Sequence, residues 1–419
     1  MEQTQRKDWM SIVLAGFCAL AILVFLAGGI LALVRGIANL QETGDASLSL
    51  LPAFLAIAAL ILLGALIGRT GWLALRQIQG KPAESAQIPP LSIGKGLVFF
   101  GGWILSIVAA AFLNARPTLG WFSLPFYLLA IGLPVYGLIR LGLGGLGSGS
   151  KLRAWGTLSA GMTVAPFLSG LIEGLVILII VVMIAVFMGL DQQRLAALQA
   201  LAEQLKNVTT QEQILALVMP YLTNPLTLVM GLFLLSVVTP LVEETAKSLP
   251  VWAAWRKLES PAQGFALGAL SGAGFGLVEG LLVSASPNAT WGTTLAVRAA
   301  SSAMHIITSG LVGWGLGKAA QQKRALPALG GYLLGISIHG IWNACVVIMV
   351  YASTLILLSG ATPNIVAALV AMSVLCFLGL LILLAPIVLW IINHQLRKSR
   401  PAAPAAEFIE PAPMENVVI

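Results

Sequence analysis

Long apolar runs recur along the whole chain, and they constrain its fold more than any other feature of the sequence. A run of 18 or more apolar residues is long enough to cross the ~30 Å hydrocarbon layer of a bilayer as a helix. Only 9% of the 419 residues are charged, whereas soluble domains carry about 25%. The short alternating segments typical of membrane β-barrels are missing from the sequence. We therefore predict an all-α protein, a polytopic transmembrane helical bundle of about ten spans, at residues 10–34, 48–68, 97–113, 121–139, 158–188, 228–255, 263–285, 294–317, 327–356 and 363–392.

The basic residues fall in alternate loops of this predicted bundle. Arg and Lys gather before the first span and after the second, fourth, sixth, eighth and tenth, and the intervening loops are poor in both. By the positive-inside rule, this pattern predicts that both termini are cytoplasmic. The same loops account for the net charge of +7, so we expect the lipid bilayer, and no nucleic acid, as a partner. The three cysteines lie in apolar segments and show neither a disulfide framework nor a CxxC spacing.

Composition changes divide the chain into predicted regions. The stretch LGLGGLGSGS at 141–150 is a Gly/Ser-rich break, and it separates an N-terminal four-span membrane region of unknown role, residues 1–150, from the remaining spans. Residues 191–224 form a sizeable non-cytoplasmic loop, in which the leucine spacing predicts two short amphipathic helices that cap the bundle. The Pro/Ala-rich segment 395–419 is predicted to be a disordered cytoplasmic tail.

Two adjacent glutamates and a lysine interrupt the apolar sequence of the sixth span, in TPLVEETAKSLP. Charges inside a membrane are costly, and for that reason they mark a functional site by default. Glu243 and Lys247 are four residues apart and share a helix face, whereas Glu244 points about 100° away. We therefore expect Lys247 to neutralise one glutamate and to leave the other free as a base. A structural ion pair between helices is the alternative.

The next three spans each add a polar residue near the middle of the bilayer. Glu279 lies beside the end of a stripe of glycines at four-residue spacing, from Gly264 to Gly280, which allows another helix to approach closely. His305 lies within the eighth span, and His339 and Asn343 share one face of the ninth. The first four spans carry no carboxylate in their cores. This concentration in four consecutive spans predicts a functional site.

The motifs EETAK, FGLVE, the lone histidine of the eighth span, and HGIWN form the ordered pattern EExxK, FxxxE, His, HxxxN. The pattern resembles the PrsW family of glutamic-type intramembrane proteases, over roughly residues 228–350. It is similar in layout to the type II CAAX prenyl endopeptidases. Those enzymes carry His where FGLVE has Glu, so prenyl-protein cleavage is not the expected activity. The resemblance implies an intramembrane protease domain over residues 151–394.

The resemblance also implies roles for the motif residues. One glutamate of EExxK would act as the general base for water, and its lysine would tune the pair. The His and Asn of HxxxN would donate hydrogen bonds to the oxyanion. The glutamate of FxxxE and the lone histidine would position the water or protonate the leaving amine. No cofactor is required by this scheme. The predicted catalytic residues are Glu243, Glu244, Lys247, Glu279, His305, His339 and Asn343.

A metal-dependent membrane protease is a different hypothesis for the same residues. Carboxylates and imidazoles are ligands that zinc accepts, although the chain has no HExxH motif. If the protein is metal-dependent, the predicted ligands are Glu244, Glu279, His305 and His339.

A proton-coupled transporter and a non-catalytic membrane scaffold also agree with the pattern, because intramembrane Glu and His can relay protons. Glu173 and Arg298 are expected to pair with each other or with solvent. Under the protease hypothesis the substrate is a membrane-anchored protein or peptide. The predicted location is the plasma membrane, as a multi-pass protein of a bacterial inner membrane.

Overall fold

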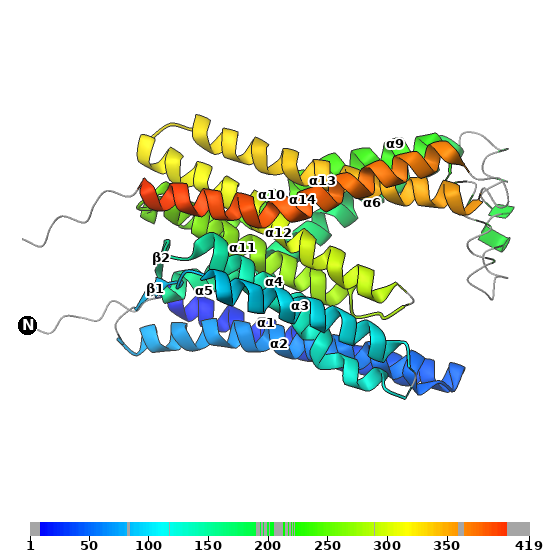
Figure 1. Ribbon diagram of the computed structural model, residues 1–419, viewed down its shortest axis with the longest axis horizontal. Helices are drawn as coiled ribbons and strands as arrows, with labels where there is room; N and C mark the ends of the chain where they lie inside the picture. Colours follow the sequence, from blue (N-terminus) through cyan, green and yellow to red (C-terminus); the bar gives the residue numbers. More distant parts are fainter. Residues whose placement is uncertain are drawn as a thin grey trace, which may run out of the picture.

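The computed structural model describes residues 9–399, except for 82–83, 117, 190–192, 194–195, 197–198, 201, 205–212, 214–216, 218, 220, 222, 289 and 359–363. Long helices lie side by side along the longest axis of the molecule (Figure 1). In the described part of the chain, ten helical segments are long and apolar enough to cross a membrane, so the predicted all-α bundle is confirmed.

The N-terminal region consists of four spans and a small sheet. Its elements are α1 (Trp9–Thr43), α2 (Ala46–Ile78), β1 (Ser85–Gln87), α3 (Ile93–Asn114), the 3-10 turn η1 (Gly120–Ser123), α4 (Leu124–Leu143) and β2 (Gly147–Ser150). Strands β1 and β2 pair antiparallel, so the Gly/Ser-rich stretch predicted as an irregular break contributes a strand. Glycine suits this turn because Gly145 and Gly149 have φ values of 77° and 83°.

The remaining spans surround the two helices that are most enclosed by protein. The elements are α5 (Lys151–Met162), α6 (Val164–Gly189), α9 (Pro225–Phe233), the π-helical turn η2 (Leu234–Val238), α10 (Thr239–Ala253), the 3-10 turn η3 (Trp255–Lys257), α11 (Pro261–Val283), α12 (Trp291–Gln322), α13 (Leu326–Leu358) and α14 (Ile365–Lys398). Nearly every side chain of α11 is buried, as are most of those of α12.

The glycine stripe explains why α11 and α12 pack so closely. A Cβ added at Gly264, Gly268 or Gly272 would collide with a backbone carbonyl oxygen of α12. Only glycine allows the two backbones this approach, as the four-residue spacing predicts. The last glycine of the stripe differs, because a Cβ at Gly280 would meet the side chain of Ile131 on α4.

Several boundaries differ from the sequence prediction. The fifth span is broken at Thr163 into α5 and α6, and the sixth contains η2 just before Pro240. Helix α14 continues to Lys398, so residues 395–398 are helical although the tail was predicted to begin at 395. Residues 400–419 lie outside the described residues, as do most of those in the predicted loop helices of 191–224.

One hydrophobic core joins the N-terminal spans to the rest of the bundle. Leu55 of α2, Tyr127 and Ile131 of α4, and Phe265 of α11 are fully buried members of the same cluster. The Tyr127 hydroxyl also donates a hydrogen bond to the carbonyl of Leu281 in α11. The first four spans therefore support the central helices directly.

Candidate active site

Helix α10 brings the charged residues of EETAK into the protein interior. Glu243, Glu244 and Lys247 are all buried, and Lys247 is completely enclosed. The ammonium Nζ of Lys247 lies 2.8 Å from Glu243 Oε2 and 2.9 Å from Glu244 Oε1. The lysine therefore pairs with both glutamates, and the prediction that one of them is left free of it is wrong.

Glu244 is the carboxylate of the cluster with the most hydrogen bonds, despite its complete burial. Besides Lys247, its Oε1 accepts hydrogen bonds from Thr308 Oγ1 at 3.0 Å and, across 2.9 Å, from His339 Nδ1. Its Oε2 accepts one from Ser309 Oγ at 2.9 Å. With both oxygens satisfied in this way, Glu244 is a fixed negative charge that holds its neighbours in place.

Sequence reasoning missed Thr308 and Ser309. Both hydroxyls come from α12 and reach Glu244 on α10. The available signal was their position three and four residues after His305, which places all three side chains on one face of α12.

His305 is held between two charged groups. Its Nδ1 lies 2.8 Å from Lys247 Nζ, and its Nε2 lies 2.9 Å from Glu279 Oε2. Because an ammonium can only donate, Nδ1 accepts and the ring proton is on Nε2, from which it is donated to Glu279. Glu279 is fixed in turn by Arg298, whose Nη1 lies 2.5 Å from Glu279 Oε1. Phe275 of α11 packs beside the imidazole, with ring centroids 5.1 Å apart.

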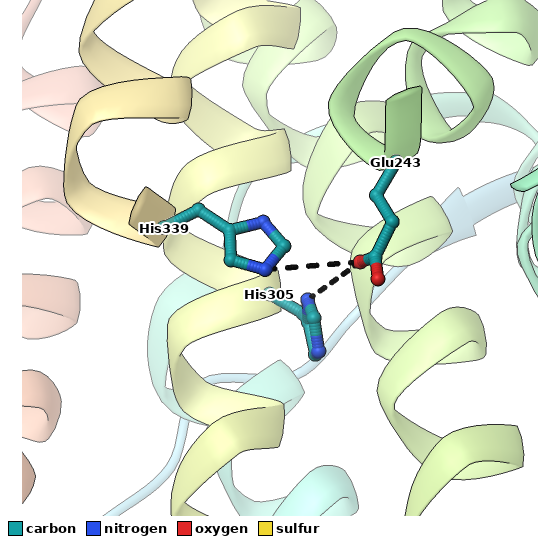
Figure 2. A group of neighbouring side chains, drawn as sticks. All are labelled: Glu243, His305 and His339. Carbon is teal, nitrogen blue, oxygen red and sulfur yellow. Dashed lines mark ion pairs between the residues drawn. The ribbon is translucent and has the colours of Figure 1, made fainter. Parts of the chain in front are cut away.

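His339 presents a free ring nitrogen to Glu243 (Figure 2). Since its Nδ1 donates to Glu244, its Nε2 carries a lone pair. That nitrogen lies 3.8 Å from Glu243 Oε2, and His305 Nδ1 lies 4.0 Å from the same oxygen. Glu243 Oε2 is buried and has an ion pair with Lys247 but no hydrogen bond of acceptable geometry. The lone pair of His339 Nε2 thus faces Glu243 Oε2, which also has the Lys247 ammonium beside it.

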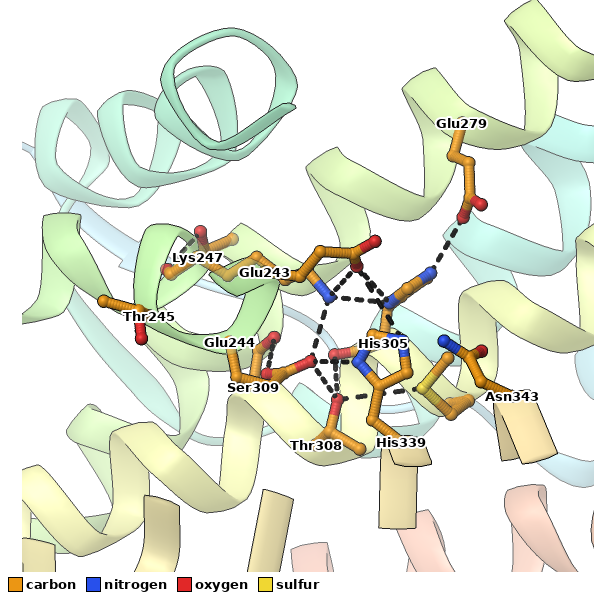
Figure 3. Close-up of polar contacts among 12 residues, drawn as sticks. Glu243, Glu244, Thr245, Lys247, Glu279, His305, Thr308, Ser309, His339 and Asn343 are labelled. Atoms are coloured by element: carbon orange, nitrogen blue, oxygen red, sulfur yellow. Dashed lines mark hydrogen bonds and ion pairs between the residues drawn. The ribbon is translucent and has the colours of Figure 1, made fainter. Parts of the chain in front are cut away.

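Asn343 does not join this network (Figure 3). Its side-chain nitrogen donates to the carbonyl of Leu235 in η2, at 2.8 Å, and the residue is only partly buried. The structure therefore brings six of the seven predicted residues together and gives the seventh a contact with η2.

Glu173 and Arg298 do not pair with each other, because Arg298 bonds to Glu279. Within the described residues, Glu173 Oε1 is buried without a hydrogen-bond partner.

The cluster contains a set of atoms that could hold a metal ion. Glu243, His305 and His339 each offer one ligand atom, and these atoms lie within 4.8 Å of one another. Each histidine bonds a carboxylate through its other ring nitrogen, Glu279 for His305 and Glu244 for His339. This is the outer-shell arrangement found around metal-bound histidines. The ligand set in the structure differs from the predicted one. Glu244 and Glu279 bond the ring nitrogens that point away from the proposed ion, and Glu243 is the carboxylate that faces the two histidines.

A family model described as PrsW family intramembrane metalloprotease matches residues 155–384, which is more than half of the chain. This chain belongs to the PrsW family. The match runs from α5 into α14, includes every residue of the cluster, and leaves α1–α4 outside. No curated protein and no solved structure matches the chain.

Membership confirms the predicted resemblance. A PrsW family chain with ten membrane-length helices is a multi-pass membrane protein of an intramembrane protease family, and its activity class is peptide hydrolysis. The family is described as a metalloprotease family, whereas the predicted resemblance implied a glutamate mechanism that needs no metal. The Glu243, His305 and His339 cluster provides a donor set for zinc.

Proposed function

We propose that this chain is an endopeptidase that hydrolyses peptide bonds of membrane-anchored proteins, in the plasma membrane of a bacterium, at a centre made of Glu243, His305 and His339. The observation that carries the proposal is the pair of facing acceptors, His339 Nε2 and Glu243 Oε2, 3.8 Å apart. Burying the His339 Nε2 lone pair without a donor costs free energy, which a cation or a proton shared with Glu243 Oε2 would offset. Catalytic zinc sites use such sets, for example two His and one Glu, and keep one position for water.

The three ligand atoms are gathered in one place. Glu243 Oε2 lies 3.8 Å and 4.0 Å from the two imidazole nitrogens, and all three atoms lie within 4.8 Å of one another. A zinc ion held by this set would draw the three atoms closer together. When bound, such an ion would lower the pKa of its water and polarise the scissile carbonyl group.

The remaining residues of the cluster keep these three side chains in place. Glu244 accepts a hydrogen bond from His339 Nδ1–H and so fixes the tautomer whose Nε2 is free. Glu279, held by Arg298, does the same for His305 from the other side. Lys247 lies between the two adjacent glutamates, and its positive charge reduces their mutual repulsion in a medium of low dielectric constant.

A metal-free mechanism is the second candidate, and one observation favours it. The ammonium of Lys247 already forms ion pairs with Glu243 and Glu244 and a hydrogen bond with His305 Nδ1, so a cation is present among the same ligand atoms. In that case Glu243 acts as the general base and takes the proton of the attacking water.

The first experiment compares the N-termini of membrane proteins in cells that carry the wild type, Glu243→Gln or Glu84→Gln. Gln keeps the shape of Glu243 and removes its charge. We expect new N-termini with the wild type and with Glu84→Gln, whose exposed carboxylate pairs with Arg76 and Lys151 and is not a member of the cluster, and none with Glu243→Gln. Identical profiles from equal amounts of all three proteins would refute proteolysis.

Metal analysis of the purified full chain separates the two mechanisms. We expect about one zinc per chain in the wild type and in Glu84→Gln, and loss of the metal in His339→Ala. Cleavage by a wild-type protein that contains no metal would establish Glu243 as a base without an ion.

A further inference from the structure

A cavity lies between the N-terminal spans and the central helices, with Leu270 and Leu277 of α11 in its wall. Its volume is about 450 Å³, within the ~300–1,000 Å³ range of small-molecule sites. Its walls are apolar and come from α2, α4, α5 and α11, for example Leu66, Val135, Leu158 and Leu277. Residues of β1 and the two that follow it line one end, and Figure 1 shows β1 and β2 at the left end of the bundle.

Cations surround this end of the cavity. Arg69 of α2, Arg140 of α4 and Lys151 of α5 line it, and none of its described lining residues is acidic. Lys151 pairs with Glu84. Arg140 donates to the carbonyls of Pro89 and Pro90 and to the Tyr136 hydroxyl, all of which are neutral.

Arg69 stacks on the Trp72 ring, with its guanidinium carbon 4.3 Å from the centroid. Among the described residues, no carboxylate pairs with either Arg69 or Arg140. Two of the three cations at the mouth therefore keep an unneutralised positive charge.

We propose that this cavity binds an anionic phospholipid, with an acyl chain along the apolar walls and the headgroup phosphate at Arg69, Arg140 and Lys151. The apolar walls of the cavity suit the acyl chain of such a lipid, and the cations at its mouth suit the negatively charged headgroup. Basic pockets between transmembrane helices bind lipid headgroups by this combination of charge and burial. A zwitterionic lipid would fill the same walls but would leave the net positive charge uncompensated.

The site links the two parts of the chain. The family match begins at residue 155, so α2 and α4 lie outside it and α11 lies inside it. A lipid in the cavity contacts both parts at once, through Leu66 on one side and Leu270 on the other. Helix α11 also carries Glu279, and Ser271 next to Leu270 donates to the Lys247 carbonyl at 2.7 Å. The lipid would therefore pack against α11, the helix that carries Glu279 of the proposed catalytic cluster, and support its position.

Native mass spectrometry of the full chain in detergent tests the proposal, with three probes. The probes are phosphatidylglycerol, phosphatidylcholine with the same acyl chains, and glycerol 3-phosphate. On the wild type we expect phosphatidylglycerol to bind at least about five-fold more tightly than phosphatidylcholine, and glycerol 3-phosphate to give no adduct. Equal binding of the two lipids, or equally tight binding of glycerol 3-phosphate, would overturn the proposal.

Two variants address the two halves of the site. Gly132 lines the cavity, and a Cβ there meets nothing within 4 Å, so Gly132→Leu places a larger side chain at an open position of the wall. We expect this variant to lose the phosphatidylglycerol adduct. Arg69→Gln removes one cation and should weaken phosphatidylglycerol about five-fold while leaving phosphatidylcholine unchanged.

Arg324→Gln is the matched control, since it removes an exposed cation from the turn between α12 and α13, outside the cavity. We expect it to bind phosphatidylglycerol as the wild type does. Wild-type affinity in both Gly132→Leu and Arg69→Gln would place the lipid elsewhere. Should Gly132→Leu fail to fold, Arg69→Gln decides, because its side chain is exposed and its loss creates no cavity.

Discussion

Glu243 and Glu244 are neighbours on α10 but have different environments. This difference indicates a different role for each residue. Glu244 is fully buried and accepts bonds from four donors, whereas Glu243 Oε2 has its ion pair with Lys247 and faces two imidazole nitrogens. We infer that Glu244 organises the cluster and that Glu243 meets water or metal. A carboxylate whose lone pairs are all occupied is a poor ligand and a poor base.

The hydroxyl of Ser309 tests this division. Ser309→Ala removes a buried, charge-assisted hydrogen bond to Glu244 Oε2, and we expect it to lower the free energy of unfolding by about 1.5–3 kcal/mol. Ser301→Ala is the control on the same helix, because that hydroxyl bonds the carbonyl of Arg298 within α12. Thermal unfolding in detergent measures both. Equal losses in the two variants would show that Ser309 does not support Glu244.

At the scale of elements, the contact between α11 and α12 determines the geometry of the cluster. Gly268→Ala would drive a Cβ into the carbonyl oxygen of Ser309 and force the helices apart. We expect a loss of about 1–3 kcal/mol in stability, as for other overpacked sites. Gly379→Ala on α14 is the control, since a Cβ there meets nothing within 4 Å. Unfolding midpoints that match for the two variants would contradict a close-packed seam.

The loop before β1 is anchored by charge, and its stability should depend on pH. Hydrogen bonding and attraction from Lys151, and then from Arg76, hold the pKa of Glu84 below its ordinary value of 4.5. Because the folded pKa is the lower one, this contribution is present above pH ~4.5 and is lost as the pH falls through the folded value. Thermal unfolding at pH ~7 should therefore separate the wild type from Glu84→Gln, and the difference should shrink below pH ~4.5. A difference that persists there would refute the ion pairs as its cause.

At the scale of the whole molecule, the shared core makes the N-terminal spans part of the folding unit. Tyr127 and Ile131 of α4 are fully buried against the central helices. We expect residues 151–399 alone to be degraded in cells or to aggregate in detergent, because the apolar face of α11 would lose its protein partners. Size-exclusion chromatography after membrane extraction tests this. A monodisperse, protease-resistant fragment would show that the predicted boundary at 150 separates independent units.

The residues of the cluster and the family could be predicted from sequence because each motif is a short segment within one span. The order of the motifs along the chain can be read without knowing how the spans pack. The four spans that carry Glu, His and Asn stood out against apolar surroundings. Thr308 and Ser309 did not, because hydroxyl side chains are common in transmembrane helices and only a partner on another helix gives them a role. Asn343 shows the reverse case. Its spacing from His339 placed it on the correct face, yet its amide bonds η2.

The ten spans follow from the apolar runs alone, since the cost of exposing backbone groups to hydrocarbon requires each run to be a helix. The same runs show which polar residues enter the membrane. The pairing of Lys247 with both glutamates, the position of Glu243 rather than Glu244 opposite the free imidazole nitrogens, and the sheet of β1 and β2 depend instead on how the helices pack. Helix rotation and separation set those contacts, and both follow from packing between segments far apart in the chain, such as the glycine seam of α11 against α12.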